Sequence, residues 1–371
     1  MKDAMHWQLK PAINISNYIT EQFLIPNFKR KDTCKMLENS GNRYAWNILR
    51  NMTKNDRPAH GVLLYGERGT GKKHLANDYA AMLLCTAEEG LRPCGKCKAC
   101  LTVKKNMHPD VFTAAKTGKL GAFTVGEAFE PKEGTVRDMR SKLYEYPSEG
   151  RSKILIFPDC TNVGSWNQVQ NMLLKILEEP PEYGYIIFTA PNKDIFLQTI
   201  LSRIISLPVS RCTEEETEKI LSETVEDYEK IKESVEICGG NIGKCFDYIN
   251  DPFEKEKIGL IDSFFKSIKT EKSYQMLLSL SPFCKDRKKA TECIEAIVET
   301  ARDSAVLQSC GKLETQMGLS RKTAKYVADN IMPGKIEQIY KAGNDAANAL
   351  RANIRADFVI SAMCADITCE N

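Results

Sequence analysis

One stretch, residues 61–76, constrains the fold of this chain more than any other. An apolar run at 62–65 leads into Gly-Glu-Arg-Gly-Thr-Gly-Lys at 66–72, and a helical pattern follows. A G-x-x-x-x-G-K spacing between a strand and a helix is typical of a loop whose backbone N–H groups surround phosphate oxygens. The helix N-terminus adds partial positive charge, and the lysine can reach the outer phosphates. We therefore expect a phosphate-binding loop (P-loop) with these binding residues: Gly66, Gly69, Gly71, Lys72 and Lys73.

One position of this loop departs from the pattern. A hydrolysing P-loop carries Ser or Thr directly after its lysine, and that hydroxyl holds Mg²⁺. Lys73 stands at this position. A second lysine can still hold phosphate as a point charge, so the sequence leaves weak nucleotide binding open while making it doubtful.

Four of the 14 cysteines form a cluster with the spacing C-x8-C-x2-C-x2-C: Cys85, Cys94, Cys97 and Cys100. Four thiolates at this density suit a tetrahedral Zn²⁺ site, and a set of four cysteines leaves no coordination position for water. The alternative is four incidental cysteines, which the close spacing disfavours. We predict a structural zinc ion rather than a catalytic one.

Composition places the chain among ordinary globular proteins. Its 371 residues are enough for two or three domains, with 42% hydrophobic and 27% charged residues. No run approaches the roughly 20 apolar residues needed to cross a bilayer. The first residues also lack the apolar segment of a signal peptide. We expect a cytoplasmic protein with no membrane partner, and the net charge of +3 neither supports nor excludes nucleic-acid binding.

Strand and helix patterns alternate up to residue 209, which predicts an α/β domain with a parallel sheet covered on both faces. The expected strands are buried runs at 62–65, 111–113, 153–157, 185–189 and 204–209. The expected helices lie at 42–54, 72–85, 135–146, 167–179 and 196–201. Beyond this point only helices are expected, beginning with a capping box of Thr213 and Glu216 for a helix to Val225.

The predicted domains follow from this change of pattern. They are an N-terminal extension (1–40), a P-loop domain (41–210) with a zinc module (85–100), a small helical lid (211–252) and an all-α C-terminal domain (253–371). We expect the helices of the last domain near 256–268, 271–280, 286–310, 320–342 and 344–367.

Three further motifs follow the P-loop and the cysteines in a fixed order. They are His-Pro-Asp-Val at 108–111, Asn-Met-Leu-Leu-Lys-Ile-Leu-Glu-Glu-Pro-Pro at 171–181 and Thr-Ile-Leu-Ser-Arg at 199–203. This order resembles the bacterial DNA polymerase III clamp-loader subunits, whose blocks read N-x-L-L-K-x-L-E-E-P-P and T-I-x-S-R-C. The resemblance covers residues 42–210, with Ile204 in place of the last cysteine. It implies an AAA+ ATPase module with an inserted zinc module, a helical lid and a C-terminal collar that holds five subunits in a ring.

Two members of that family share the zinc module: the hydrolysing gamma/tau subunit and the non-hydrolysing delta-prime subunit. Hydrolysis needs Mg²⁺ held by the P-loop hydroxyl and by an Asp after the neighbouring strand. By resemblance that Asp is replaced by Pro158, and only Asp159 stands at the position of the second acid. The lid arginine of the family's G-S-x-R block is replaced by Gly243, and we expect Lys244 to point elsewhere on its helix. With Lys73, these three losses favour a catalytically inactive, delta-prime-like subunit.

The resemblance assigns a catalytic role in trans to Ser202 and Arg203. In the family this arginine is a finger that enters the ATP site of the neighbouring subunit, where a guanidinium offsets charge on the transferred phosphoryl group. The alternative is a surface arginine near the start of a strand. Glu178 and Glu179 point about 100° apart on a helix and are expected to have structural roles. His108 is expected to order a turn rather than to add a fifth metal ligand.

The partners implied by the resemblance are the gamma/tau motor and delta subunits of a hetero-pentamer, with the sliding clamp and primer-template DNA reached through the assembly. One alternative is a divergent gamma/tau-type ATPase in which Asp159 and Lys73 have taken over; the absence of a long proline-rich tail after residue 371 weighs against it. The other is a zinc-containing P-loop adaptor outside replication.

Overall fold

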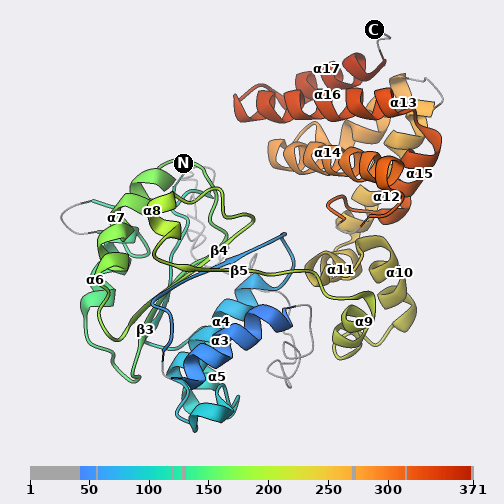
Figure 1. The fold of residues 1–371 in the computed structure, drawn as a ribbon. Helices are drawn as coiled ribbons and strands as arrows, with labels where there is room; N and C mark the ends of the chain where they lie inside the picture. Colours follow the sequence, from blue (N-terminus) through green and yellow to red (C-terminus); the bar gives the residue numbers. More distant parts are fainter. Residues whose placement is uncertain are drawn as a thin grey trace, which may run out of the picture.

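The computed structural model describes residues 42–55, 57–118, 121–127, 131–269, 273–313 and 316–368. The predicted N-terminal extension, residues 1–40, lies outside the described residues. Along the chain, an α/β part is followed by three short helices and then by a larger group of helices, with the short helices lying between the other two parts (Figure 1).

A five-stranded parallel sheet forms the centre of the α/β part, with strand order β2-β3-β4-β1-β5. The expected α/β class with a parallel sheet is thus confirmed. The strands are β1 (Gly61–Tyr65), β2 (Val111–Thr113), β3 (Lys153–Phe157), β4 (Gly184–Ala190) and β5 (Ile205–Pro208).

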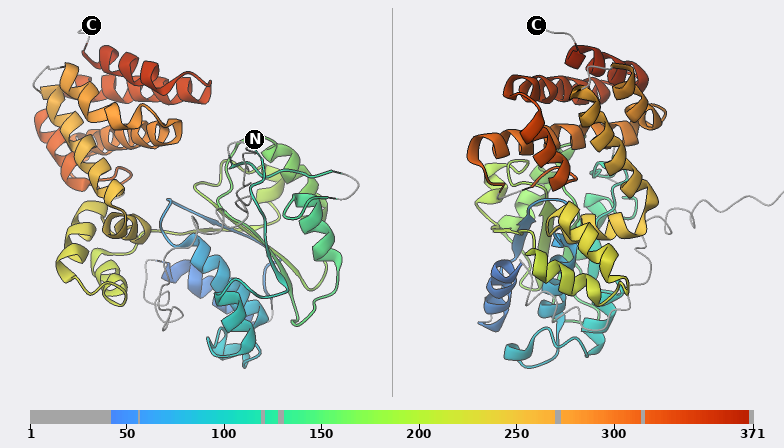
Figure 2. Two further views of the ribbon diagram at one scale, coloured as in Figure 1. Left: turned by 180° about the vertical axis from the view of Figure 1, so that it is seen from behind. Right: turned by 90° about the vertical axis from the view of Figure 1, so that its right-hand side faces the viewer.

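Helices cover both faces of this sheet, which explains why its central strands are almost wholly apolar. One face carries α3 (Arg43–Lys54), α4 (Lys72–Leu84) and α5 (Lys98–Lys104). The other carries α6 (Val136–Tyr144), α7 (Trp166–Glu178) and α8 (Gln198–Leu201) (Figure 2). Side chains alternate along a strand. Val62 and Leu64 therefore enter the core beneath α3–α5, and Leu63 enters the core beneath α6–α8.

The prediction that residues 111–113 form a buried strand is wrong about burial. These residues do form β2, but Val111 and Phe112 are only half-buried and Thr113 is exposed. The reason is position, because β2 lies at the edge of the sheet and pairs only with β3. Edge position depends on the strand order, which a local pattern does not contain.

The three short helices after the sheet, called the lid below, are α9 (Glu214–Ser222), α10 (Tyr228–Cys238) and α11 (Ile242–Asn250). The predicted capping box is confirmed: the Glu216 N–H donates to the Thr213 hydroxyl, and the Thr213 N–H donates to the Glu216 carboxylate. The helices pack on their own small core, which includes Leu221 and Val235.

The C-terminal helices, called the collar below, share one core that includes Phe264, Phe265 and Ile297. They are α12 (Pro252–Lys269), α13 (Ser273–Leu280), α14 (Arg287–Cys310), α15 (Arg321–Asn330), α16 (Pro333–Arg351) and α17 (Ala356–Thr368).

The predicted helices 320–342 and 344–367 are wrong, because three helices occupy this segment. The first break precedes Pro333, which disfavours helical geometry in the residue before it and begins α16. The second break includes Asn353 with a φ of +68°. Gly343 lies inside α16, where a Cβ would come within 2.5 Å of Val298 Cγ2 on α14. This glycine permits close helix packing and does not end a helix.

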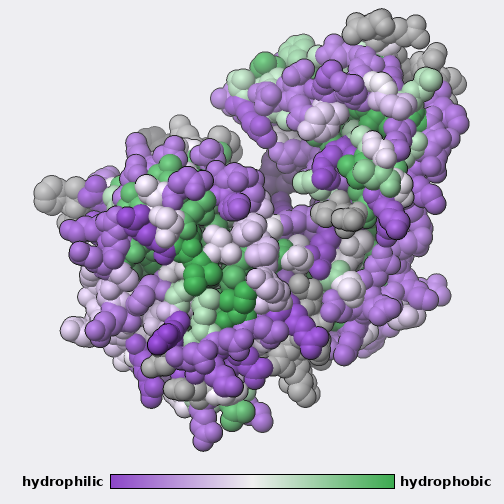
Figure 3. All heavy atoms as spheres, in the orientation of Figure 1, coloured by the Kyte–Doolittle hydropathy of each residue, from purple (hydrophilic) through white to green (hydrophobic). Residues whose placement is uncertain are grey.

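Within the described part of the chain, no helix combines the length and the apolar character that crossing a membrane requires. Polar residues cover much of the face shown in Figure 3, and apolar residues gather in a strip over the α/β part.

Candidate functional site

The loop between β1 and α4 has the backbone conformation that its glycines predict. Gly66 and Gly69 have φ values of +153° and +89°. A Cβ on Gly66 would lie 2.2 Å from the Val209 carbonyl oxygen, and a Cβ on Gly69 would lie 2.2 Å from Asn241 Oδ1. Both positions therefore require glycine for conformation and for space.

Lys72 spans this loop from its buried position at the start of α4. Its Nζ donates to the carbonyl oxygens of Gly66 at 2.7 Å and Glu67 at 2.6 Å. Burial lowers the pKa of Lys72, and the negative charges of Asp159 and Glu67 act in the opposite direction. The following residue, Lys73, is exposed and offers no hydroxyl for a metal ion.

The turn after β3 supplies one acid to the same edge of the sheet. The Asp159 N–H donates to Thr189 Oγ1 at 2.8 Å, and its carbonyl oxygen accepts from Lys116 Nζ at 2.6 Å. The Asp159 carboxylate is exposed and close enough to Lys72 to influence its pKa. Pro158 has no carboxylate, so the site contains one of the two acids that hold magnesium and position water in hydrolysing P-loop enzymes.

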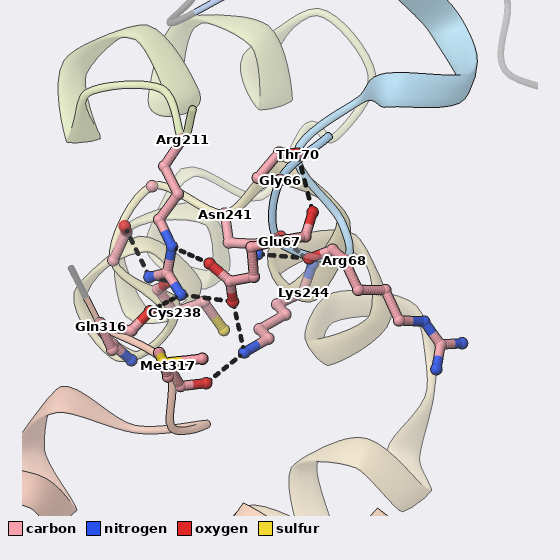
Figure 4. Close-up of polar contacts among 12 residues, drawn as sticks. Gly66, Glu67, Arg68, Thr70, Arg211, Cys238, Asn241, Lys244, Gln316 and Met317 are labelled. Carbon is pink, nitrogen blue, oxygen red and sulfur yellow. Dashed lines mark hydrogen bonds and ion pairs between the residues drawn. The ribbon is translucent and has the colours of Figure 1, made fainter. Parts of the chain in front are cut away.

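The lid packs directly on the P-loop (Figure 4). Gly243 donates its backbone N–H to the Gly69 carbonyl at 2.9 Å, and Asn241 Nδ2 donates to the Arg68 carbonyl at 2.8 Å. A Cβ on Gly243 would lie 2.6 Å from Gly69 Cα. An arginine at position 243 cannot fit without moving the loop, which explains the glycine there.

A three-membered ion network reinforces this contact. Glu67 of the P-loop accepts two hydrogen bonds from Arg211, one of them 2.6 Å long from Nη2, and lies 2.9 Å from Lys244 Nζ. The exposed fractions of the three side chains are 20%, 12% and 19%, so water screens the network only in part. The expectation that Lys244 points elsewhere is wrong: Lys244 points to the P-loop because Glu67 supplies an anion there.

The same cations extend the network to the collar. Arg211 also donates to the carbonyls of Cys238 and Gln316, and Lys244 Nζ donates to the Met317 carbonyl at 2.8 Å (Figure 4). Glu67 thus connects the P-loop with the lid and with the turn between α14 and α15. From α14, Glu299 faces these charges; burial raises its pKa to about 7, and Lys244 offsets that rise only in part.

The sequence pattern did not reveal Glu67 or Arg211 as site residues. Glu67 occupies a variable position of the loop motif, and Arg211 lies 144 residues away. The only available signal was an acidic residue in a loop that is built to attract anions.

Replacing Glu67 by alanine is expected to destabilise the fold, because it leaves Arg211 and Lys244 mostly buried without their anion. Hydrogen bonds to charged groups contribute about 1.5–3 kcal/mol, so we expect a loss of about 2 kcal/mol in the free energy of unfolding. Urea unfolding monitored by circular dichroism measures it. Glu182→Ala, at an exposed glutamate outside the network, is the matched control. Equal stability of the two variants would show that the network adds nothing.

Arg203 lies at the other end of β1 from the P-loop. It directly precedes Ile204, against which Gly61 packs, and Ile205 pairs with Val62 at the start of β1. The P-loop follows the last residue of this five-residue strand. At about 3.3 Å per residue the strand is about 13 Å long, so Arg203 cannot reach the P-loop of its own chain.

The Arg203 side chain lies on the surface and is held by its own chain. Nη1 donates to the Thr199 carbonyl at 2.8 Å and to Ser202 Oγ at 3.1 Å, and Nη2 donates to Glu178 Oε1 at 2.8 Å. The predicted pair Ser202–Arg203 therefore has a defined geometry in which the serine hydroxyl supports the guanidinium.

The structure brings the four clustered cysteines together at the junction of α4 and α5, with Cys100 in the first turn of α5. Their sulfur atoms all lie within 4.8 Å of one another, and the Sγ atoms of Cys85 and Cys97 are 3.9 Å apart. Tetrahedral zinc with Zn–S bonds of about 2.3 Å requires sulfur–sulfur distances of about 3.8 Å. The donor set and its spacing therefore fit a zinc ion.

Backbone N–H groups further prepare this cluster for a cation. Cys94, Cys97 and Cys100 each donate a backbone N–H to the sulfur of another cysteine of the cluster, at 3.4 Å. Partial burial alone disfavours the Cys97 thiolate, but hydrogen bonds led by the Cys100 N–H lower its pKa to about 6. Burial raises the pKa values of Cys85 and Cys100, so a bound cation is needed to make those two into thiolates.

His108 orders a turn near this cluster, as expected. Its Nδ1 accepts the Asp110 N–H at 3.1 Å. The Asp110 carboxylate accepts backbone N–H groups from residues 148, 149 and 150. Among the described residues, the candidate metal site consists of the four cysteine sulfurs alone, and His108 contributes no atom to it.

A P-loop at the carboxyl edge of a five-stranded parallel sheet, followed by a helical lid that packs on the loop, defines a protein of the AAA+ P-loop class. Residues 41–213 match the family model described as "DNA polymerase III, delta subunit". Over these residues, somewhat less than half of its length, the chain is similar to the delta-prime and gamma/tau subunits of DNA polymerase III.

Individual relatives include both kinds of subunit. The chain is 30% identical to the DNA polymerase III subunit delta' of Pseudomonas aeruginosa over 49% of its own length and 53% of that protein. It is 28% identical to the subunit gamma/tau of Mycoplasma pneumoniae over 60% of its own length and 30% of that protein. The chain thus spans about half or less of these curated relatives.

Among solved structures, a DNA polymerase III gamma subunit-related protein from Thermotoga maritima is 15% identical. It covers 88% of this chain and 98% of its own, with a TM-score of 0.40. This overall similarity is too low to support the assignment, which rests on the sequence matches.

Proposed function

We propose that this chain is a delta-prime-like subunit of the clamp loader. It does not hydrolyse ATP but supplies Arg203 to the ATP site of a neighbouring subunit. The observation that carries the proposal is the separation of the two features by β1: the P-loop lies at one end of the strand and Arg203 at the other. An arginine in that place cannot act at the P-loop of its own chain, which supports a role at a site on another chain.

The degenerate chemistry of the P-loop supports the first half of the proposal. Lys73 and Pro158 remove both magnesium ligands, and Gly243 leaves the lid without its arginine. In their place the lid is held by protein contacts to Glu67, Arg68 and Gly69. In this proposal, these protein contacts do the work of holding the lid against the P-loop that a bound nucleotide does in a hydrolysing subunit.

The partners of this subunit are, in this proposal, the gamma/tau motor and delta subunits of a cytoplasmic hetero-pentamer, with the collar joining the ring. The sliding clamp and primer-template DNA are reached through the assembly. Zinc held by the four cysteines stabilises the module at 85–100 and takes no part in chemistry.

Two substitutions in the reconstituted assembly separate the proposed roles. Lys72→Ala is expected to leave DNA-stimulated ATP hydrolysis within about twofold of wild type, because this chain contributes no hydrolysing site. Arg203→Ala is expected to lower hydrolysis strongly at the one site that Arg203 serves, which single-turnover kinetics resolve as a slow phase. A large loss from Lys72→Ala, in an assembly of normal composition by gel filtration, contradicts the proposal.

A second candidate, a divergent gamma/tau-type ATPase, is favoured by one observation: Asp159 lies close enough to Lys72 to influence its pKa. In that case the isolated chain turns over ATP with magnesium, and Asp159→Asn removes the activity.

A further inference from the structure

The carboxylate that holds Arg203 comes from the end of α7. Glu178 is the last residue of that helix, and Pro180 and Pro181 follow it closely. Prolines cannot continue the helical hydrogen bonds, so they fix the point at which the helix ends. Helix α7 is anchored in the core through Leu173 and Ile176. Glu178 therefore has a fixed backbone from which to reach Arg203.

The hydrogen bonds of Arg203 leave part of the guanidinium available. Of the five N–H donors of an arginine, two on Nη1 and one on Nη2 are used within the chain. Among the described residues, no partner is recorded for the other two, the Nε–H and one hydrogen of Nη2. The side chain is 35% exposed, so an acceptor from another molecule can approach it.

The neighbouring glutamate has no such contact. Glu179 is exposed and lies after the helix with φ −131° and ψ 70°. No hydrogen bond or ion pair of its side chain occurs among the described residues. The family block thus contains two adjacent glutamates with the same charge, of which only the first touches the arginine.

We propose that Glu178 is a positioning residue for Arg203: it holds the guanidinium in one orientation, with two donors directed at the phosphates of a neighbouring subunit. This inference rests on the proposed function of Arg203. An arginine side chain is long and flexible, and orienting it at the moment of reaction costs rate. Contacts with Glu178, Thr199 and Ser202 fix that orientation before the neighbour binds.

The test is ATP hydrolysis by the reconstituted loader with variants of this chain. Glu178→Ala is expected to lower the rate constant of the one site that Arg203 serves about fivefold in single-turnover kinetics, with an unchanged affinity for ATP, since a partly exposed ion pair has a modest effect. Glu178→Gln retains an oxygen acceptor and is expected to recover most of the rate. Glu179→Ala is the matched control and is expected to behave like wild type.

The double variant Glu178→Ala, Arg203→Ala distinguishes positioning from a general structural effect. If Glu178 acts through Arg203, the double variant has the same rate as Arg203→Ala alone. The inference is wrong if Glu178→Ala has the same rate as Glu179→Ala, if Glu178→Ala hydrolyses ATP faster than wild type, or if it lowers the rate further when Arg203 is absent.

Failure of the inference can be told from failure of the proposed function. If Arg203→Ala itself has no effect on hydrolysis, the proposed function fails and this inference fails with it. If Arg203→Ala lowers the rate as expected but Glu178→Ala leaves it unchanged, only the inference fails.

Discussion

Replacing Arg203 by alanine is expected to lower ATP hydrolysis at the neighbouring site of the assembled loader by about 10³-fold, the lower end of the range for arginine fingers. The physical reason is the loss of a positive charge that offsets charge on the transferred phosphoryl group. The isolated chain is not expected to lose stability, because Arg203 lies on the surface and its ion pair with Glu178 is solvent-exposed in part.

The measurement is DNA-stimulated ATP hydrolysis under single-turnover conditions, after reconstitution with the motor and delta subunits. Arg151→Ala, at an exposed arginine, is the matched control for the loss of one positive charge. Because the other sites of the ring continue to turn over, single-turnover kinetics should show one slow phase. An unchanged rate at every site contradicts a role in trans.

Removing the metal is expected to have the second large effect, confined to the zinc module. Cys100→Ala deletes one buried ligand and leaves three, which is too few for a closed structural site. We expect the zinc content to fall from about one ion per chain to near zero. Residues 85–105 should lose hydrogen-exchange protection, because the binding energy of structural zinc is folding energy.

Metal analysis and hydrogen exchange of the two proteins test this expectation. Cys310→Ala, at an exposed cysteine of α14, controls for the loss of a thiol. The collar and the face of the sheet covered by α6–α8 have cores that contain none of the four cysteines, and both are expected to keep their protection. A Cys100→Ala protein with wild-type zinc content would remove the assignment of the four cysteines.

Local pattern was enough to predict the parts of the fold whose causes are local. The buried runs of β1, β3 and β4, the glycines of the P-loop and the capping box at Thr213 each follow from neighbouring residues. The grouping of Cys94, Cys97 and Cys100 is also local, because these three cysteines lie in one turn and at the start of α5.

The differences arise where distant residues decide the structure. Thr113 is exposed because of strand order, and Gly343 lies within a helix because α14 packs against it. Lys244 points to the P-loop because Glu67 is there. The placement of Arg203 opposite the P-loop needs the pairing of β5 with β1, which no motif specifies.

ATP turnover by the purified chain alone, with magnesium and with primer-template DNA, tests the central claim most directly. A subunit without magnesium ligands is expected to show no hydrolysis above the background of a Lys72→Ala control. Turnover that requires both magnesium and Lys72 would contradict the account and would make this chain a motor.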